Sequence, residues 1–105
     1  MFDINIKCIY DETIRFKWDE SKRIANIRER RLDFADAKLM FHGRMVVRLD
    51  KRLDYGEIRY LAYGLVKNRL MAVVYTQREQ NIIRIISFRK ANKREQAFYE
   101  KKIKN

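Results

Sequence analysis

The feature that most constrains the fold is a series of four apolar segments in the second half of the chain. They are rich in Val, Ile, Tyr and Phe, the residue types that strands favour, and lie at 44–49, 57–66, 69–76 and 81–89. The intervening "KN" (67–68) and "QREQ" (77–80) are short enough for hairpin turns. We therefore predict a β-meander whose last three strands are antiparallel neighbours.

Helical patterns flank this meander. Asp19 and Asp33 each precede a run in which apolar residues recur at helical spacing, which indicates two N-capped helices in succession. The apolar positions are Ile24, Ala25, Ile27 and Leu32 in the first run (20–31), and Phe34, Ala37 and Phe41 in the second. A third helix is predicted from its N-cap, Asn92, to Lys102. The predicted fold class is α+β: two N-terminal helices, an antiparallel meander and a C-terminal helix in a two-layer sandwich.

The start of the chain contains two stretches of alternating apolar and polar residues, 4–10 and 14–18. We expect both to be strands, paired as a hairpin across "DET". Cys8 alternates with apolar residues, so we interpret it as a packed small side chain. The chain has no Pro, three Gly and no linker or repeat, so residues 1–105 are expected to form one domain.

The reactive residue types exclude several kinds of site. A single Cys rules out an intrachain disulfide and a Cys-rich metal site. The single His, His42, leaves no His pair for acid–base catalysis, and we interpret it as a turn residue. The sequence contains neither zinc-ligand spacing nor a Gly-rich phosphate loop. It therefore predicts no cofactor and no metal site.

The charge balance favours a polyanionic partner. There are 25 basic and 14 acidic residues, a net charge of +11, which attracts nucleic acid, acidic protein or anionic membrane. No apolar run approaches the roughly 20 residues of a spanning helix, and the basic C-terminal stretch has too narrow an apolar face for a membrane-surface helix. The N-terminus shows no signal-peptide pattern, so a cytoplasmic location is expected.

Two arginines, Arg59 and Arg84, interrupt predicted strands that are otherwise apolar. A cation in such a position is costly unless it is paired or faces a wet groove. One interpretation is a shared cradle for a phosphate group, because a guanidinium binds phosphate oxygens bidentately. The other is that each arginine pairs with an acid on the sheet, such as Glu57 or Glu79.

The C-terminal segment, residues 89–105, carries seven basic and two acidic residues. It is either a solvated helix surface or a surface that binds nucleic acid. Phe98 falls on the side expected to pack on the sheet, whereas Tyr99 is either a buried prop or a phenol directed toward the basic cluster. The residues expected to bind a nucleic-acid backbone are Lys90, Lys93, Arg94, Lys101 and Lys102.

Three segments, taken together and in this order, resemble the BrnT family of bacterial toxins, relatives of the RelE-type ribonuclease toxins. They are "DYGEIRY" (54–60), "RIIS" (84–87) and "RKANKRE" (89–95), within a similarity that covers roughly residues 14 to 100. The resemblance implies a small metal-independent ribonuclease that stops translation and has a RelE-like fold. It also implies a ribbon-helix-helix antitoxin of the BrnA type, through which alone operator DNA is bound.

The chain departs from the family pattern in two places. The family has a Lys-His-Gly turn between its first two helices, where this chain has Glu29, Arg30 and Arg31, so any role of that histidine is absent. Residues 1–13 extend beyond the usual start, and are either an added strand or a difference in start site.

The residues and the resemblance suggest one mechanism. RNA supplies its own nucleophile, the 2′-hydroxyl, so the protein need only position it and stabilise the charge that develops on the phosphate. Our hypothesis is that Arg59 and Arg84 hold this phosphate with help from Arg89, and that Tyr99 or Glu57 transfers the proton. The alternatives are a non-enzymatic nucleic-acid-binding or repressor subunit, and an inactive relative that only binds the antitoxin.

Overall fold

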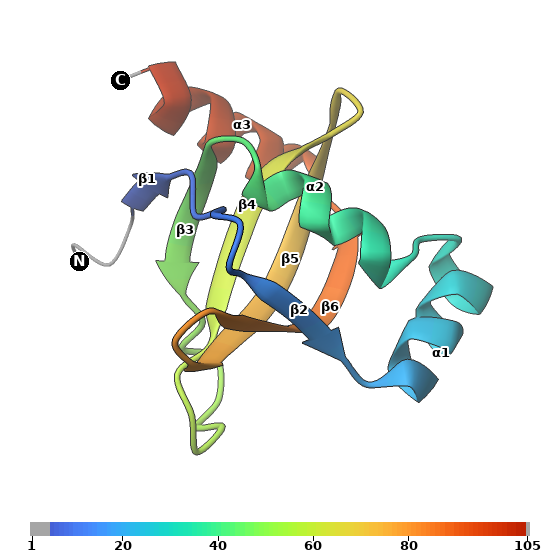
Figure 1. Ribbon diagram of the computed structural model, residues 1–105. Coiled ribbons are helices and arrows are strands. Elements are labelled where there is room, and N and C mark those ends of the chain that lie inside the picture. The colour runs from blue at the N-terminus through green and yellow to red at the C-terminus, as the bar shows by residue number, and fades with distance from the viewer. Residues whose placement is uncertain (1–4, 105) are drawn as a thin grey trace.

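Residues 5–104, which the computed structural model describes, form a mixed α+β fold around a six-stranded sheet of order β1-β3-β4-β5-β6-β2 (Figure 1). The strands are β1 (Asn5–Lys7), β2 (Arg15–Trp18), β3 (Met45–Leu49), β4 (Tyr60–Val66), β5 (Arg69–Glu79) and β6 (Ile82–Lys90). The helical segments are α1 (Glu20–Arg30), the 3-10 helix η1 (Phe34–Ala37), α2 (Lys38–Phe41) and α3 (Lys93–Lys104).

The predicted meander is confirmed, with two changes in its strand ends. β4, β5 and β6 are antiparallel neighbours, and Lys67 and Asn68 form the first turn with positive φ angles of 50° and 68°, as a tight hairpin requires. The predicted turn at 77–80 is wrong, because β5 continues to Glu79 and the chain turns at 80–81, where Asn81 has a φ of 75°. β4 begins only at Tyr60, so Arg59 lies in the preceding loop and not within a strand.

The two N-terminal strands exist, but the predicted hairpin between them is wrong. β1 pairs antiparallel with β3, whereas β2 pairs parallel with β6 at the opposite edge of the sheet (Figure 1). Phe16 and Trp18 lie opposite Ile83 and Ile85 in this parallel pairing, and all four side chains join the same core. Burial beside β6 therefore determines where β2 lies. Residues 1–4 and 105, including the first position of the predicted strand 4–10, lie outside the described residues.

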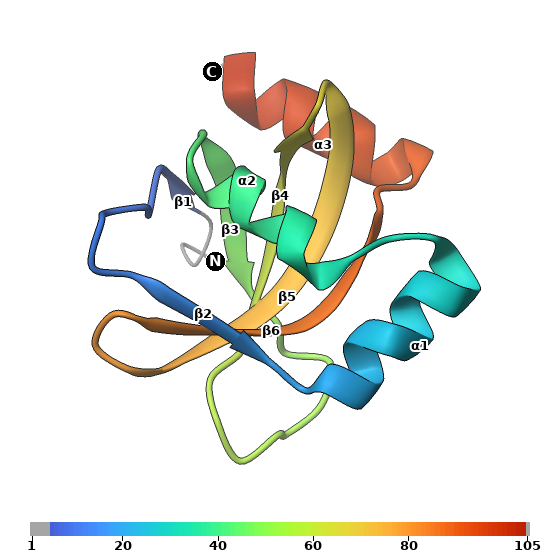
Figure 2. The same cartoon turned by 45° about the vertical axis from the view of Figure 1, so that its right-hand side comes forward.

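The first helix forms as predicted but buries a different side. Asp19 caps α1 by accepting hydrogen bonds from the backbone N–H groups of Ser21 and Lys22. Ile24 and Ile27, expected to be core residues, are 47% and 37% exposed. The buried residue of α1 is Asn26, whose Nδ2 donates to the carbonyl oxygens of Leu32 and Phe88, both at 3.0 Å. A polar contact thus docks α1, which projects from the sheet where β2 ends (Figure 2).

The second predicted helix is a 3-10 turn, η1, continued by the short α2. Asp33 caps η1 by accepting from the N–H of Ala35, and its carboxylate also pairs with Arg23 of α1 at 2.8 Å. The predicted core positions Phe34, Ala37 and Phe41 are all buried. This segment therefore lies over the centre of the sheet and does not form a second N-terminal helix beside α1 (Figure 1).

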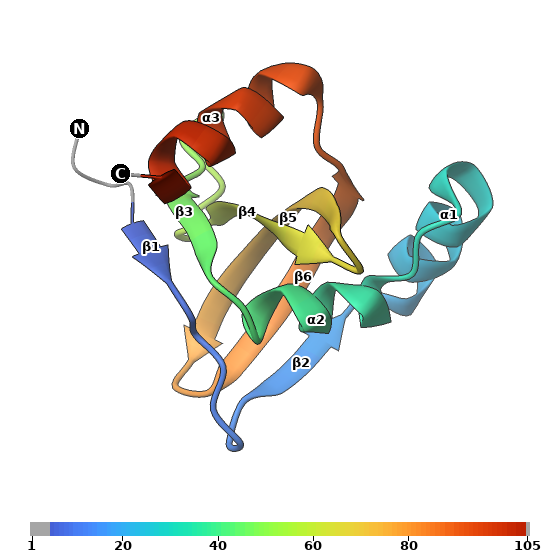
Figure 3. The same cartoon turned by 90° about the horizontal axis from the view of Figure 1, so that it is seen from above.

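Helices cover both faces of the sheet, so the predicted two-layer arrangement is wrong (Figure 3). On one face, which we call the η1–α2 face, the buried residues that pack beneath the two helical segments are Val47, Ala62, Met71, Val73, Tyr75, Ile83, Ile85 and Phe88. On the other, the α3 face, Val46, Tyr63 and Ala72 pack against Phe98, Tyr99 and Ile103 of α3. Neighbouring residues alternate between these faces, as the pleat of a strand requires.

Two single residues of the sequence prediction can now be placed. His42 ends α2 as an exposed turn residue, as predicted, and its ring stacks on that of Tyr10 at 3.8 Å. Cys8 is exposed, so its interpretation as a packed side chain is wrong. Its thiol lies 3.3 Å from the carbonyl oxygen of His42, at the point where the N-terminal segment leaves β1 and passes the end of α2. The Cys8 thiol thus has a polar contact with the backbone of this turn but is not enclosed by core side chains.

Candidate functional site

Five arginines gather on and beside the part of the α3 face that α3 leaves uncovered. α3 crosses one end of the sheet, near the β4–β5 hairpin, whereas the loop between β3 and β4 lies at the opposite end (Figure 1). Strand alternation puts Arg48 on the same side as Val46, and Arg89 on the same side as its cross-strand partner Ala72. We call this set the arginine face: Arg48, Arg84 and Arg89 on strands, and Arg52 and Arg59 in the loop.

The best-anchored member is Arg89. Its two terminal nitrogens bind both carboxylate oxygens of Glu95 at 2.8 and 2.9 Å, and the Tyr63 hydroxyl donates to the same carboxylate at 3.1 Å. Glu95 also accepts from the N–H of Asn92, while Asn92 caps the N–H of Glu95, which confirms the predicted cap of α3. The guanidinium of Arg89 lowers the pKa of Glu95 to about 2, and burial raises that of Tyr63 to about 12. The network stays charged and fixed at neutral pH.

A second anchored arginine lies at the base of the loop. Arg52 makes a bidentate pair with Asp50, whose side chain is only 1% exposed, at 2.7 and 2.8 Å. These hydrogen bonds lower the pKa of Asp50 to about 2. Arg52 lines a hollow of 370 Å³ with Arg48 and Tyr63, among others. Two cations and a phenol therefore meet in one depression of the arginine face.

Glu57 holds two arginines at the far end of this loop. Its carboxylate accepts from Nε of Arg78 at 3.0 Å and from Nε of Arg59 at 3.1 Å. These contacts, that of Arg78 first, lower the pKa of Glu57, so the carboxylate is ionised at neutral pH. The guanidinium of Arg59 also lies over the Tyr55 ring, 4.0 Å from its centroid. For Arg59, the predicted alternative of pairing with Glu57 is confirmed.

Arg84 differs from these arginines because its side chain makes no hydrogen bond or ion pair with any residue in the described part of the chain. It is half-buried on β6, opposite Thr76 of β5 and Lys17 of β2. The Thr76 hydroxyl donates to the Ile58 carbonyl at 2.7 Å. This hydrogen bond holds Ile58, the residue before Arg59, beside Thr76, which is the cross-strand partner of Arg84. The structure thus brings Arg59 and Arg84 to one corner of the sheet and leaves Arg84 free to bind a ligand.

The other residues predicted to be functional lie elsewhere. Arg89 is five residues beyond Arg84 on β6, roughly 15 Å at the usual rise of a strand, so the two cannot hold the same phosphate oxygen. Tyr99 is half-buried against the α3 face, near Leu70 at the β4–β5 hairpin end, and is not brought to Arg59 and Arg84. The predicted backbone-binding residues are exposed in or beside α3, except for Lys102, which is half-buried: Lys90, Lys93, Arg94, Lys101 and Lys102.

Sequence reasoning missed Arg48, Arg52 and Tyr63, and also the two carboxylates that anchor arginines of this face, Asp50 and Glu95. Arg48 alternates with Val46 in "RMVVRL", and this spacing was a usable signal for a cation on the face that α3 covers. Its guanidinium lies 5.6 Å from the centroid of Phe98, and Lys102 approaches the same ring at 5.7 Å. Arg52 and Tyr63 carried no such signal, because their positions depend on the path of the loop and on the docking of α3.

No helix formed by residues 5–104 is long and apolar enough to cross a membrane. No group of three or more His, Cys, Asp or Glu side chains within that range is arranged to hold a metal ion.

Comparison with known proteins identifies the family of this chain. Residues 18–95 match the family model described as the ribonuclease toxin BrnT of type II toxin-antitoxin systems. The chain belongs to the BrnT family. A solved structure, the 1.1 Å crystal structure of the Brucella abortus ribonuclease toxin BrnT, is similar with 25% identity and a TM-score of 0.57. The similarity covers 76% of this chain and 99% of the Brucella chain. A search of curated proteins found no match.

Membership in the BrnT family has two direct consequences. A toxin of a type II toxin-antitoxin system has an antitoxin as its partner. The family match includes the loop and strands that carry the arginine face, but it begins at residue 18 and ends at residue 95. Strand β1, most of β2 and most of α3 therefore lie outside the part of the chain that this BrnT match covers.

Proposed function

We propose that this BrnT-family toxin is a metal-independent endoribonuclease whose active site is the Arg59–Arg84 corner of the arginine face. The observation that carries the proposal is Arg84, a half-buried guanidinium on a strand with no acidic partner in the described part of the chain. Leaving a cation partly desolvated is unfavourable for folding alone. A bound phosphate offsets that cost, and RNA is the polyanion that the family description of a ribonuclease toxin suggests.

The proposed reaction is attack of the ribose 2′-hydroxyl on the adjacent phosphate. The 2′-oxygen forms a bond to phosphorus as the 5′-oxygen of the next nucleotide leaves and takes up a proton, giving a 2′,3′-cyclic phosphate and a free 5′-hydroxyl. Arg84 and Arg59 bind the non-bridging oxygens, on which negative charge increases in the transition state. This stabilisation needs neither a metal nor histidine.

Proton transfer makes a smaller contribution in this scheme. Glu57 is near the corner and ionised, so it can accept the proton of the 2′-hydroxyl, but its lowered pKa makes it a weak base. It also fixes the guanidinium of Arg59. Tyr99, the other residue considered for this role, lies at the opposite end of the sheet, and we propose that it binds RNA and does not transfer the proton.

RNA beyond the cleaved bond is proposed to cross α3. Arg89, held in place by Glu95, contacts a phosphate one or more nucleotides from the cut. The cations proposed to bind successive backbone phosphates on and beside α3 are Lys90, Lys93, Arg94, Lys101 and Lys102. Their contribution is electrostatic and independent of base sequence.

In the cell, we propose that cleavage of RNA in the cytoplasm stops translation, as the resemblance to BrnT toxins, relatives of the RelE-type toxins, implies. The antitoxin partner is proposed to be a ribbon-helix-helix protein of the BrnA type, and operator DNA is bound only through their complex. The net charge of +11 supports an acidic or amphipathic partner that covers much of the arginine face.

The direct test is cleavage of a defined RNA by the purified chain in excess EDTA, with the new ends analysed by mass spectrometry. We expect fragments with 2′,3′-cyclic phosphate ends. A complete requirement for added Mg²⁺ would overturn the mechanism, and RNA that is shifted in a gel but stays intact would favour a binding protein. Induced expression without antitoxin should arrest growth; unimpaired growth with verified soluble protein would contradict the role as a toxin.

A further inference from the structure

Strand β2 places two further cations beside Arg84, on the same face of the sheet. Phe16 and Trp18 pack into the core of the η1–α2 face, so the pleat of the strand directs Arg15 and Lys17 to the opposite face. In the parallel pairing with β6, Lys17 lies directly opposite Arg84. Both Arg15 and Lys17 are exposed, and we call them the β2 cations.

The β2 cations and Arg84 have no counter-charge in the protein. None of the three side chains makes a hydrogen bond or an ion pair with any residue in the range 5–104. Glu79, which faces β6 from its other side, makes no ion pair with Arg15 either. Like charges directly opposite each other on neighbouring strands destabilise a sheet. An anion bound between Lys17 and Arg84 would remove this repulsion.

Protection of the sheet edge does not by itself explain a cation at position 17. β2 is an edge strand, and charge on an edge strand discourages pairing with another chain. A charge of either sign has this effect. An acid at position 17 would protect the edge and also attract Arg84 across the strands, whereas Lys17 repels it. The repulsion is therefore better explained by an anionic ligand.

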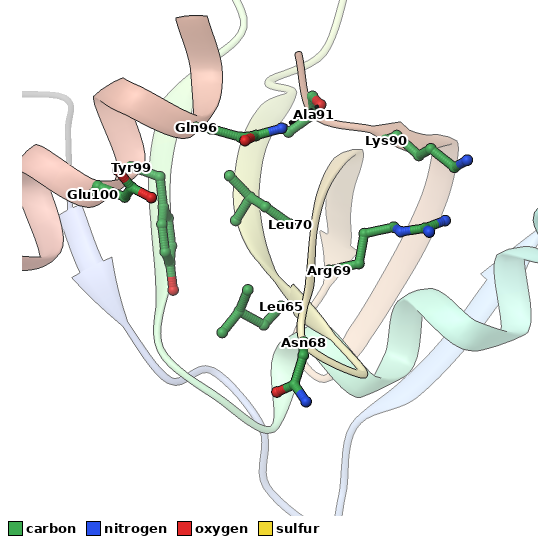
Figure 4. Close-up of a pocket in the computed structure, with 9 residues that line it drawn as sticks. All are labelled: Leu65, Asn68, Arg69, Leu70, Lys90, Ala91, Gln96, Tyr99 and Glu100. Atoms are coloured by element: carbon green, nitrogen blue, oxygen red, sulfur yellow. Dashed lines mark hydrogen bonds between the residues drawn. The ribbon is translucent and has the colours of Figure 1, made fainter. Parts of the chain in front are cut away.

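The β2 cations continue the arginine face away from α3. At the β4–β5 hairpin end of the sheet, α3 lies over the strands, and Figure 4 shows its Tyr99 beside Leu65 and Leu70 of the hairpin. RNA that leaves the Arg84 corner toward that end crosses the outer side of α3, as proposed above. Toward β2, the last strand of the sheet, it instead meets the exposed Lys17 and Arg15.

The chemistry of this edge fits a nucleic-acid backbone better than a protein. Arg15 and Lys17 are two residues apart, about 7 Å along a strand, so each can contact a different phosphate. Among the described residues, no large hydrophobic side chain of β2 or β6 is exposed. A protein partner would therefore find little of the apolar surface that forms the centre of an interface. Cations alone suffice for phosphates, whatever the base sequence.

We infer that the β2 cations bind the RNA backbone on one side of the cleaved bond, while α3 binds the backbone on the other side. The inference rests on the proposed ribonuclease function and deepens it, because the substrate is then a strand that continues in both directions from the cut. Arg15 and Lys17 precede residue 18, where the BrnT match begins. This half of the RNA path thus lies outside the part of the chain that the match covers.

The test measures the two sides of the substrate separately. A DNA strand with a single ribonucleotide contains one 2′-hydroxyl and therefore one bond that can be cleaved, and it is lengthened by a few nucleotides on its 5′ or its 3′ side. For the parent chain, each extension should raise kcat/KM several-fold. Arg15→Gln and Lys17→Gln should lose the gain from one extension and keep the other, and Lys93→Ala, on α3, should show the reverse pattern.

The matched control is Arg28→Gln, which removes the same charge from the exposed surface of α1 and should change neither gain. Lys17→Glu separates ligand binding from protection of the edge. It keeps a charge on β2 and can pair with Arg84, so the melting temperature should stay the same or rise. Cleavage should nevertheless fall roughly a hundredfold, because Arg84 is neutralised. Cleavage by Lys17→Glu at the parent rate would overturn the inference.

Binding of a strand that is entirely 2′-O-methylated distinguishes failure of this inference from failure of the proposed function. If the parent chain cleaves no RNA but Lys17→Gln weakens binding and lowers the slope of log K against log salt by about 0.7, the ribonuclease mechanism is rejected and the β2 contact is kept. If the parent chain cleaves RNA but Arg15→Gln and Lys17→Gln behave like Arg28→Gln, the β2 contact is overturned and the ribonuclease is kept. If Lys17→Gln leaves RNA binding unchanged and weakens antitoxin binding, the β2 cations contact protein and the inference is wrong.

Discussion

The two faces of the sheet are built from the same strands and have opposite chemistry. On the η1–α2 face, the large side chains of Phe41, Tyr75 and Ile85 are each no more than 2% exposed. On the α3 face, Tyr63 bonds a carboxylate, and half-buried Phe98 has cations on its ring. One face is covered by apolar packing, whereas the part of the other face that α3 does not cover carries guanidinium groups.

The comparison shows how one short sequence separates stability from function. Because side chains alternate along a strand, a change at one position affects one face and leaves the next residue on the other. Phe88 belongs to the core, and Arg89, its neighbour, belongs to the arginine face. We therefore expect variants of the two faces to have different measurable effects.

The largest effect on folding should come from Phe41→Ala, on the η1–α2 face. Phe41 is fully buried and contacts the rings of Phe16 and Tyr75. Its truncation should cost about 3–5 kcal/mol in the free energy of unfolding, measured by urea denaturation. Phe98→Ala on the α3 face is the matched control, with an expected cost below about 2 kcal/mol because the ring is only half-buried. Equal costs would contradict the division between the faces.

The next effect should be on catalysis and not on folding. Arg84→Ala should slow single-turnover RNA cleavage roughly a hundredfold, about 2.7 kcal/mol of transition-state stabilisation, because it removes the unpaired cation of the corner. RNA binding and the melting temperature should change little. A folded variant that cleaves at the parent rate would exclude Arg84 from the site, and a large fall in melting temperature would indicate a structural role.

A smaller effect, dependent on pH, should follow from Glu95→Gln. The pKa of Glu95 is about 2 in the folded chain against an ordinary 4.5, so ionised Glu95 stabilises the fold above pH 4.5, and this contribution is lost as pH falls from 4.5 to 2. At pH 7 the variant should lose about 1–2 kcal/mol, and its stability should fall less on acidification. Asp50→Asn is the comparison variant for the other anchored arginine, because the pKa of Asp50 is also lowered to about 2. An unchanged acid profile would show that Glu95 is not the anchor of Arg89.

The smallest effects should come from the outer side of α3. Lys93→Ala removes an exposed cation with no protein partner in the described part of the chain, so it should weaken RNA binding only several-fold. The slope of log K against log salt should fall by about 0.7, equally for different RNA sequences, with no change in melting. Lys102→Ala should do the same but also lower stability slightly, since its ammonium contacts the Phe98 ring. A sequence-dependent loss would assign Lys93 to base recognition.

Local features of the fold were predictable, and pairings between distant segments were not. The caps at Asp19, Asp33 and Asn92 and the turn at 67–68 are confirmed because each depends on a few adjacent residues. The position of β2 depends on β6, more than sixty residues away, and nothing in residues 14–18 encodes that parallel partner. The apolar residues of α1 predicted the wrong buried side for a similar reason. The contact that holds this helix is a hydrogen bond from the buried amide of Asn26 to the carbonyl oxygen of Phe88, which is distant in the sequence.

The candidate site was predictable to the same extent. Alternation in the apolar strands indicated Arg84 as an exception, and the structure leaves it unpaired among the described residues. Arg59 shows the same pattern in the sequence. In the fold, however, the loop brings the Glu57 carboxylate within hydrogen-bonding distance of the Arg59 guanidinium. Whether an arginine pairs with an acid depends on where the folded backbone places that acid. The spacing of residues in the sequence does not give this position.

The short strands β1 and β2 affect how the protein behaves at high concentration. They form the two outer edges of the sheet and keep the longer apolar strands β3 and β6 from being edges. Very short edge strands that carry charge, such as Arg15 and Lys17, are poor templates for another chain. A chain shortened to begin at residue 19 would lose both edge strands and expose the β6 backbone of "IIRIIS", an aggregation-prone segment, so we expect β1 and β2 to limit aggregation.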